Sequence, residues 1–164
     1  MKFEDSYVGR LRAKVGNDML KLPGACVVIL NRIDGQEHVL LERGPGRARW
    51  RLIGGIAEAR ESLLQCALRE VHEETGLTLF DLRPFGFCDD PGRIFTLANG
   101  HVVHAHTMLF VTDRFEGKPM PDGVELEECR WFTRHRLPDT LHPTARLHLE
   151  AYARFEASGQ FQLL

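Results

Sequence analysis

The chain has 164 residues, of which 43% are hydrophobic and 27% are charged, and its formal net charge is -2. This length fits a single domain over residues 1–164 with a core that needs no disulfide support. The small net charge gives no general attraction to nucleic acid or to an anionic membrane. No apolar run approaches the roughly 20 residues that span a bilayer. We therefore expect a small molecule bound at a local site, and neither nucleic acid nor a membrane as a partner.

The cysteines and the N-terminus give an expectation about location. The four cysteines are widely spaced and form no Cys-x-x-Cys pair, which argues against a zinc ribbon or a thioredoxin-like motif. Residues 1–10 are charged and lack the apolar core of a signal peptide. We expect reduced cysteines and a cytoplasmic location.

Most of the chain is predicted to form short strands. Residues 1–20 are expected to be an N-terminal strand or arm, in which 6–15 are the candidate strand. After them, runs of β-branched and aromatic residues bounded by Gly, Pro or Asp predict further strands. These strands are expected at residues 25–31, 38–42, 50–53, 56–57, 77–88 with a break at Pro84, 101–112 and 125–133.

Two helices interrupt the strands. Residues 61–75 form the clearer one, because Ser62 and Gln65 have the spacing of a capping box and Gly76 is a stop signal. Residues 143–157 carry apolar side chains at helical spacing. Strands around a central helix, followed by a closing helix, predict an α/β sandwich with a mixed sheet.

The first helix carries three carboxylates on one face. At about 100° per residue, Glu70, Glu73 and Glu74 lie close together and beside the apolar stripe. Like charges in this arrangement destabilise a helix, and they lie toward the end of the helix dipole that favours cations. A divalent cation would remove both costs, and Mg²⁺ or Mn²⁺ prefers oxygen ligands. A solvated acidic face is the alternative explanation of these residues taken alone.

The flanking residues complete a known signature. From residue 55 to residue 77 the chain has glycine, five residues, glutamate, seven residues, Arg-Glu, an aliphatic residue, any residue, Glu-Glu, any residue, glycine and an aliphatic residue. This is the pattern of the Nudix box, and the chain resembles the Nudix hydrolase family, MutT-like members included. Trp50 with Gly54-Gly55 and Trp131-Phe132 with Leu137-Pro138 extend the resemblance. Ile53 and Arg60 depart from it, since Pro and Gly are frequent there, which puts the shape of the loop in question.

The resemblance implies a Nudix-type α/β/α sandwich and a role for each residue of the box. Glu70, Glu73, Glu74 and the carbonyl of Gly54 would bind Mg²⁺, with Mn²⁺ as a substitute. Either Glu70 or a carboxylate of a later loop would be the general base. Arg69 would orient the carboxylates and Glu61 would hold the loop, while Gly55 would allow close approach of the substrate.

The later-loop carboxylate is expected to be Glu125, which follows a turn at 121–123 and precedes Trp131 by six residues. Glu127 and Glu128 are alternative candidates. The simpler explanation of Glu125 is that it is an ordinary polar residue at the start of a strand. Among the arginines at 43, 47, 49 and 51, Arg43 is the first choice for a substrate phosphate, since arginine suits phosphate. Strand histidines and aromatic residues are more simply explained as ordinary strand and core residues.

The expected reaction is cleavage of a diphosphate bond in a nucleoside triphosphate, including an oxidised or non-standard one, as in MutT-like members. A nucleoside diphosphate sugar such as ADP-ribose is an alternative substrate, weakly favoured by Pro91 in the loop after the box. The extra signatures of the NADH and coenzyme A branches are not seen. A non-catalytic nucleotide sensor is a second class of function, and a homodimer is left open.

Overall fold

The longest strand, β1 (Leu20–Ile33), has 14 residues and organises the sheet. Its first half pairs antiparallel with β3 (Ile53–Ile56), its second half pairs antiparallel with β2 (Gln36–Arg43), and its other edge runs parallel to β7 (Val102–Thr112). The computed structural model describes residues 3–97, 99–124 and 126–164. Because β1 pairs with β3 as well as with β2 and β7, it fixes where the glycines of β3 lie.

The remaining strands extend this sheet on both sides. The eight-stranded mixed sheet has the order β10-β5-β7-β1-β2-β9, with β3 on β1 and β6 on β7, and β4 and β8 form a separate pair. Their bounds are β4 Thr78–Phe80, β5 Arg83–Cys88, β6 Ile94–Thr96, β8 Arg114–Glu116, β9 Glu128–Thr133 and β10 Gln162–Leu163.

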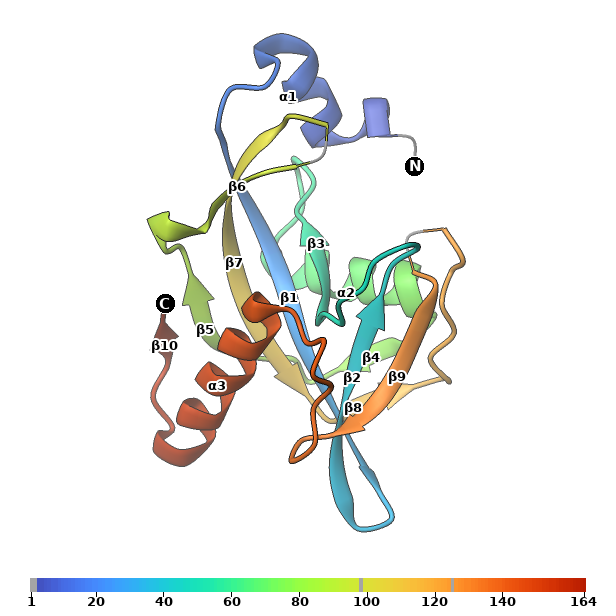
Figure 1. Ribbon diagram of the computed structural model, residues 1–164. Helices are drawn as coiled ribbons and strands as arrows, with labels where there is room; N and C mark the ends of the chain where they lie inside the picture. The colour runs from blue at the N-terminus through green and yellow to red at the C-terminus, as the bar shows by residue number, and fades with distance from the viewer. Residues whose placement is uncertain (1–2, 98, 125) are drawn as a thin grey trace.

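Two helices cover opposite faces of the sheet, as Figure 1 shows for α2 (Leu63–Thr75) and α3 (Pro143–Ser158). Alternate residues of β1 supply the two cores. Val27 and Ile29 pack with α2, whereas Val28 and Leu30 pack with α3. This alternation is the period of two of a strand with both faces buried. The α/β/α sandwich with a mixed sheet is therefore confirmed.

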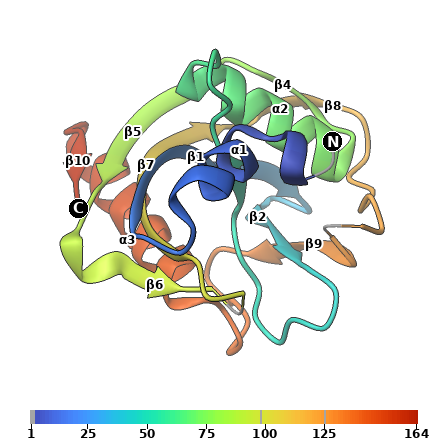
Figure 2. The same ribbon diagram turned by 90° about the horizontal axis from the view of Figure 1, so that it is seen from above.

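The N-terminal segment corrects an expectation. Residues 6–15 form neither a strand nor a loose arm: after a short 3₁₀ turn, η1 (Phe3–Asp5), they form the helix α1 (Tyr7–Val15) with Ser6 as its N-cap. The buried Arg12 donates to the carbonyls of Gly16, Asp18 and Val102, which ties α1 to the start of β7. Seen from above, α1 lies over one end of the sandwich (Figure 2). The helix is thus anchored by tertiary hydrogen bonds from a polar side chain.

Other differences are local. The strand expected over 77–88 is interrupted at residues 81–82, where Asp81 has a φ of 51°. At the break expected at Pro84, β5 continues, but its pairing with β7 shifts register between Pro84 and Gly86. A short 3₁₀ helix, η2 (Pro91–Arg93), leads into β6. Within residues 3–97, 99–124 and 126–164, no helix is long and apolar enough to cross a membrane.

Candidate active site

The acidic helix begins and ends where its capping residues predict. The Ser62 hydroxyl accepts from the backbone N–H of Gln65, and the Gln65 side chain accepts from the N–H of Ser62, which completes the capping box. Gly76 ends the helix in the left-handed conformation. The loop before α2 and the last turn of α2 therefore have defined positions relative to β3.

The two glycines of β3 are required for different reasons. Gly54 has a φ of 155°, and a Cβ there would lie 2.2 Å from the carbonyl oxygen of Ala25 on β1. At Gly55 a Cβ would lie 2.3 Å from the carboxylate carbon of Glu70. The Glu70 carboxylate thus lies directly over the bare backbone of Gly55. Gly54 allows the strand pairing, and Gly55 allows helix α2 to bring its carboxylate to the strand.

Arg69 ties the loop to the helix. Its Nε and Nη2 donate to the two carboxylate oxygens of Glu61 at 2.8 and 2.9 Å, and Nη2 also donates to the carbonyl of Ile56. Its Nη1 lies 2.9 Å from Oε1 of Glu70 and 3.0 Å from Oε2 of Glu73. The hydrogen bond from Arg69 holds the pKa of Glu61 below its usual value. One guanidinium therefore positions three carboxylates, as a bidentate arginine can.

Glu74 lies against a carboxylate that sequence reasoning missed. Glu42, near the end of β2, is 1% exposed and Glu74 is 6% exposed. Burial, together with their mutual proximity, raises the pKa of Glu74, and burial raises that of Glu42 against the opposing effect of Arg51. Arg51 Nη2 lies 2.7 Å from Oε1 of Glu42. Alternation could have found Glu42, because Leu40, two residues earlier, faces α2.

Only some of these carboxylates are placed to bind a divalent cation in this structure. Glu74 Oε2 and Glu42 Oε2 are buried without a hydrogen-bond partner among the described residues, and such oxygens suit a cation. Glu73 differs, because its side chain is 61% exposed and is bound to Arg69. In the described part of the chain, no three His, Cys, Asp or Glu side chains converge as a metal-binding group. The site thus has suitable oxygens but no assembled ligand set of described residues.

Glu70, Glu74 and the glycines of β3 face one cavity of about 500 Å³. Its lining combines the β3 glycines, Glu70 and Glu74 with two cations, Arg47 and Arg51. The complete lining is Pro45, Arg47, Arg51, Gly54, Gly55, Ile56, Glu70, Glu74 and Val124. Carboxylates beside arginines in one hollow can bind a cation and a phosphate together.

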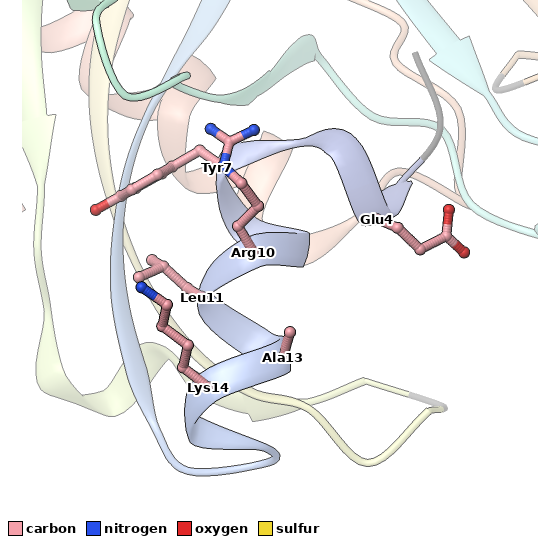
Figure 3. Close-up of a pocket in the computed structure, with 6 residues that line it drawn as sticks. All are labelled: Glu4, Tyr7, Arg10, Leu11, Ala13 and Lys14. Atoms are coloured by element: carbon pink, nitrogen blue, oxygen red, sulfur yellow. The ribbon is translucent and has the colours of Figure 1, made fainter.

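A second hollow, of about 410 Å³, is lined by Glu4 and by residues of α1 (Figure 3). Tyr7, Leu11 and Lys14 lie toward the same side of the helix there. Its lining has one carboxylate, Glu4, and none of the predicted site residues. This surface lacks the oxygen donors that the metal chemistry needs.

The loop that carries Glu125 packs on the end of α2. The N–H groups of Met120 and Asp122 donate to the carbonyls of Thr75 and Glu74, and Val124 lines the cavity. Glu125 itself lies outside the described residues, so its role as a ligand stays a prediction. The alternative Glu128 is bound to Arg43 at 2.7 Å, on β9.

Arg43 is not brought to the cavity. Its guanidinium lies over the ring of Trp50, 5.2 Å from the centroid, and pairs with Glu128. Arg43 follows Glu42 directly, so the two side chains point to opposite faces of β2. The arginines that reach the cavity are Arg47 and Arg51, which belong to the same cluster in the sequence.

The histidines of β7 have structural contacts instead of a metal arrangement. His104 Nε2 lies 3.0 Å from the carbonyl oxygen of Asp89, and His106 lies 3.3 Å from the His104 ring nitrogen. Trp50 and Phe85 are buried in the core beneath α3. These histidines and aromatic residues thus have the contacts of ordinary strand and core residues.

The fold and the cavity together define a Nudix protein, and comparison with known families agrees. The family model of the NUDIX domain matches residues 20–155, and the chain belongs to this family of hydrolases. Among its relatives is the NAD-capped RNA hydrolase NudC of Vibrio vulnificus, 33% identical over 115 residues, which are 69% of this chain and 40% of that protein. The NAD-capped RNA hydrolase ndx-9 of Caenorhabditis elegans is 32% identical over 66% of this chain and 28% of that protein.

A solved structure gives a further likeness. The MutT Nudix hydrolase of Burkholderia pseudomallei superposes with a TM-score of 0.65 at 26% identity, covering 80% of this chain and 98% of that one. Since the chain spans less than half the length of the two NAD-capped RNA hydrolases, the likeness to them concerns the shared domain. The family prediction is confirmed, and the preference for a MutT-like triphosphate is not settled by these relatives.

Proposed function

We propose that this chain is a Mg²⁺-dependent pyrophosphohydrolase that cleaves a diphosphate bond of a nucleotide by attack of water on phosphorus. One observation carries the proposal: Glu70, Glu74 and the β3 glycines share a single cavity with Arg47 and Arg51. This combination supplies oxygen ligands and phosphate-binding cations to the same space. Mn²⁺ would substitute, because it accepts the same ligands.

The cation would be held by Glu70, Glu74 and the carbonyl of Gly54, with Glu73 and Glu125 as the further ligands that the family resemblance implies. Glu42 is an added candidate, because one of its carboxylate oxygens is buried beside Glu74 without a partner among the described residues. When bound, a divalent cation stabilises charge on phosphate oxygens and lowers the pKa of bound water.

The remaining residues position the reactants. Arg69 and Glu61 hold the loop against α2, so that Glu70 stays over Gly55. Arg47 and Arg51 would bind the non-bridging oxygens of the diphosphate. Glu70, or a carboxylate of the loop around Glu125, would accept the proton of the attacking water.

The first substrate class is a nucleoside triphosphate, with a nucleoside monophosphate and pyrophosphate as products. The likeness to the MutT Nudix hydrolase supports it, because that likeness covers nearly the whole of that chain. A nucleoside diphosphate sugar such as ADP-ribose contains the same diphosphate and is the alternative within this reaction.

A second candidate is a dinucleotide, free or at the end of RNA. It is favoured by relatives that are NAD-capped RNA hydrolases and are up to 33% identical to this chain. Cleavage would then give two monophosphates. A nucleic acid would be a partner in that case, contrary to the expectation from net charge.

The test is metal-dependent release of products across one panel of substrates. The panel contains (d)NTPs, 8-oxo-dGTP, ADP-ribose, NAD, dinucleoside polyphosphates and RNA that begins with NAD, each with Mg²⁺ and with EDTA. We expect turnover of one class with Mg²⁺ and none with EDTA. Nucleotide-dependent thermal stabilisation without turnover anywhere would contradict the proposal and favour a nucleotide sensor.

A cytoplasmic location is part of the same proposal. All four cysteines are free, two of them buried, and free thiols suit a reducing compartment. Microscopy of a tagged chain in its own cells checks this, and a signal confined to an oxidising compartment would contradict it.

A further inference from the structure

A cationic surface lies where segment 47–51 meets the first turn of α3. The N–H of Trp50 donates to the carbonyl of Thr140 at 3.0 Å, and the N–H of His142 donates to the carbonyl of Trp50 at 2.8 Å. These two bonds hold the segment that carries Arg49 and Arg51 beside His142, the N-cap residue of α3. The N-terminus of a 16-residue helix adds a partial positive charge there.

Arg93 approaches the same turn from the other side. Its Nη1 donates to the hydroxyl of Thr144 at 2.8 Å, and its Nε is buried without a hydrogen-bond partner among the described residues. Neither Arg49 nor Arg93 forms an ion pair with a carboxylate of the described chain. Two arginines near a helix N-terminus that form no ion pair among the described residues favour an anion.

A buried histidine supplies an independent indication of a ligand. His148 is 4% exposed, and neither of its ring nitrogens has a hydrogen-bond partner in the described part of the chain. It lies four residues after Thr144, hence on the same helix face, and helical side chains lean toward the N-terminus. Buried polar groups are normally hydrogen-bonded. The ring therefore points toward the turn that Arg93 contacts and leaves its polar atoms unused.

The protonation state of His148 allows its ring to donate a hydrogen bond. Burial, and then the nearby Arg93 and His142, lower its pKa to about 4. The ring is therefore neutral at neutral pH, with one N–H donor and one acceptor. Its contribution to an anion is a hydrogen bond, whereas the arginines and the helix dipole contribute the charge.

We propose that Arg49, Arg93 and the first turn of α3 bind a phosphate group of the nucleotide substrate that lies outside the scissile diphosphate. The inference rests on the proposed function. Arg51 links the diphosphate cavity to the first turn of α3. Its side chain lines the cavity, and it directly follows Trp50, whose backbone is hydrogen-bonded to Thr140 and His142. The substrate class is thus a nucleotide with a further phosphate on its ribose or in a phosphodiester chain.

The first test is a titration with inorganic phosphate in EDTA, which keeps divalent metal ions out of the acidic cavity. The ring nitrogens of His148 are followed by long-range ¹H–¹⁵N correlation, with Arg93→Gln, Arg49→Gln and the matched control Arg146→Gln. Arg146 is exposed on the same turn but two residues from Thr144, on another face. We expect a saturable shift of His148 in the wild type and in Arg146→Gln, and at least a tenfold weaker affinity in the other two variants.

Absence of that shift, or equal affinities in all four proteins, would overturn the site. Arg49→Gln keeps the test decisive if Arg93→Gln does not fold, because Arg49 is exposed. This titration needs no turnover, so its failure leaves the hydrolase proposal standing, and failure of the substrate panel leaves the titration interpretable.

The second test compares substrates that differ by one phosphate. ATP is paired with its 3′-phosphorylated counterpart and NAD with its 2′-phosphorylated counterpart. We expect the wild type to favour a phosphorylated member in kcat/KM by about tenfold, which corresponds to about 1.4 kcal/mol. Arg49→Gln should lose that preference and keep its rate on the plain nucleotide. An unchanged preference in Arg49→Gln would contradict a substrate phosphate at this site.

Discussion

Arg69 and Glu61 form a two-pronged ion pair that a lysine cannot reproduce, because lysine has one charged nitrogen where arginine has a planar fork. We predict that Arg69→Lys lowers kcat/KM by about 100-fold, the cost of misplacing a reacting group by about an ångström. The free energy of unfolding should change by no more than about 1 kcal/mol, because the pair is partly exposed.

Steady-state kinetics and urea unfolding check this prediction, with Arg146→Lys as an exposed control. A variant Arg69→Lys with the wild-type kcat/KM would show that the pair does not position Glu70. Large loss of stability with proportionate loss of activity would assign Arg69 a structural role alone.

The side chains of the site were predictable where the information is local. Helical periodicity placed Glu70 and Glu74 near each other, because both belong to one helix. Glu42 and Arg43 show the limit. Alternation along β2 puts the two side chains on opposite faces, but the approach of Glu42 to Glu74 follows from the packing of β2 against α2, which the sequence does not display. Glu73 shows another limit, because its contact with Arg69 competes with the metal role implied by the family.

At the scale of the element, we predict that replacing each of the two glycines of β3 by alanine affects stability differently. Gly54→Ala should destabilise the fold by several kcal/mol, because the methyl group meets the backbone of Ala25 and the φ of 155° disfavours alanine. Gly55→Ala meets the flexible end of the Glu70 side chain, so it should fold with a loss of about 1 kcal/mol or less. Its activity should nevertheless fall sharply, because Glu70 must leave its position.

Thermal unfolding and kinetics of both variants check this separation. Equal melting temperatures for Gly54→Ala and the wild type would contradict the strand geometry. Full activity in Gly55→Ala would mean that the position of Glu70 over the glycine is unimportant.

A helix could be predicted from the sequence where the residues that cap it stand next to its ends. Helix α2 is bounded by Ser62, Gln65 and Gly76, all of which cap it as expected. Helix α1 was missed although Ser6 caps it, because the segment is short and Arg12 anchors it to a carbonyl that lies 90 residues away in the sequence. The length of β1 was underestimated because its first residues are stabilised by pairing with β7, about 80 residues away.

At the scale of the whole molecule, His148 predicts an acid-dependent loss of stability. Its pKa is lowered in the folded protein from 6.5 to about 4, so its contribution is complete above pH 6.5 and is lost as the pH falls toward 4. The shift corresponds to a loss of up to about 3 kcal/mol. Urea unfolding at pH 7 and pH 4 should show a smaller loss in His148→Phe than in the wild type.

The comparison with His148→Phe is needed because other groups titrate in the same range. Glu61 and Glu156 also have lowered pKa values, since each accepts hydrogen bonds from an arginine, and their contributions are lost on acidification in both proteins. An identical loss in the two proteins would contradict a buried, neutral His148.

The layers of the molecule were predictable, and its substrate was not. The order of strands and helices predicted the sandwich, because alternating apolar faces leave few ways to bury them. We expect substrate choice to depend on the loops around residues 44–52 and 117–124, which contact the start of α3 and the end of α2 respectively.

The most direct test of the metal-dependent site is the substitution Glu74→Gln, with the exposed Glu150→Gln as its control, measured on the substrate that the panel identifies. We predict a folded Glu74→Gln protein whose metal-free melting temperature equals or exceeds that of the wild type, because a buried carboxyl beside Glu42 is removed. Its Mg²⁺-dependent turnover should fall by at least about 100-fold, and stabilisation by Mg²⁺ should disappear. A well-folded Glu74→Gln protein that turns over at the rate of Glu150→Gln would contradict the assignment of this cavity as the active site.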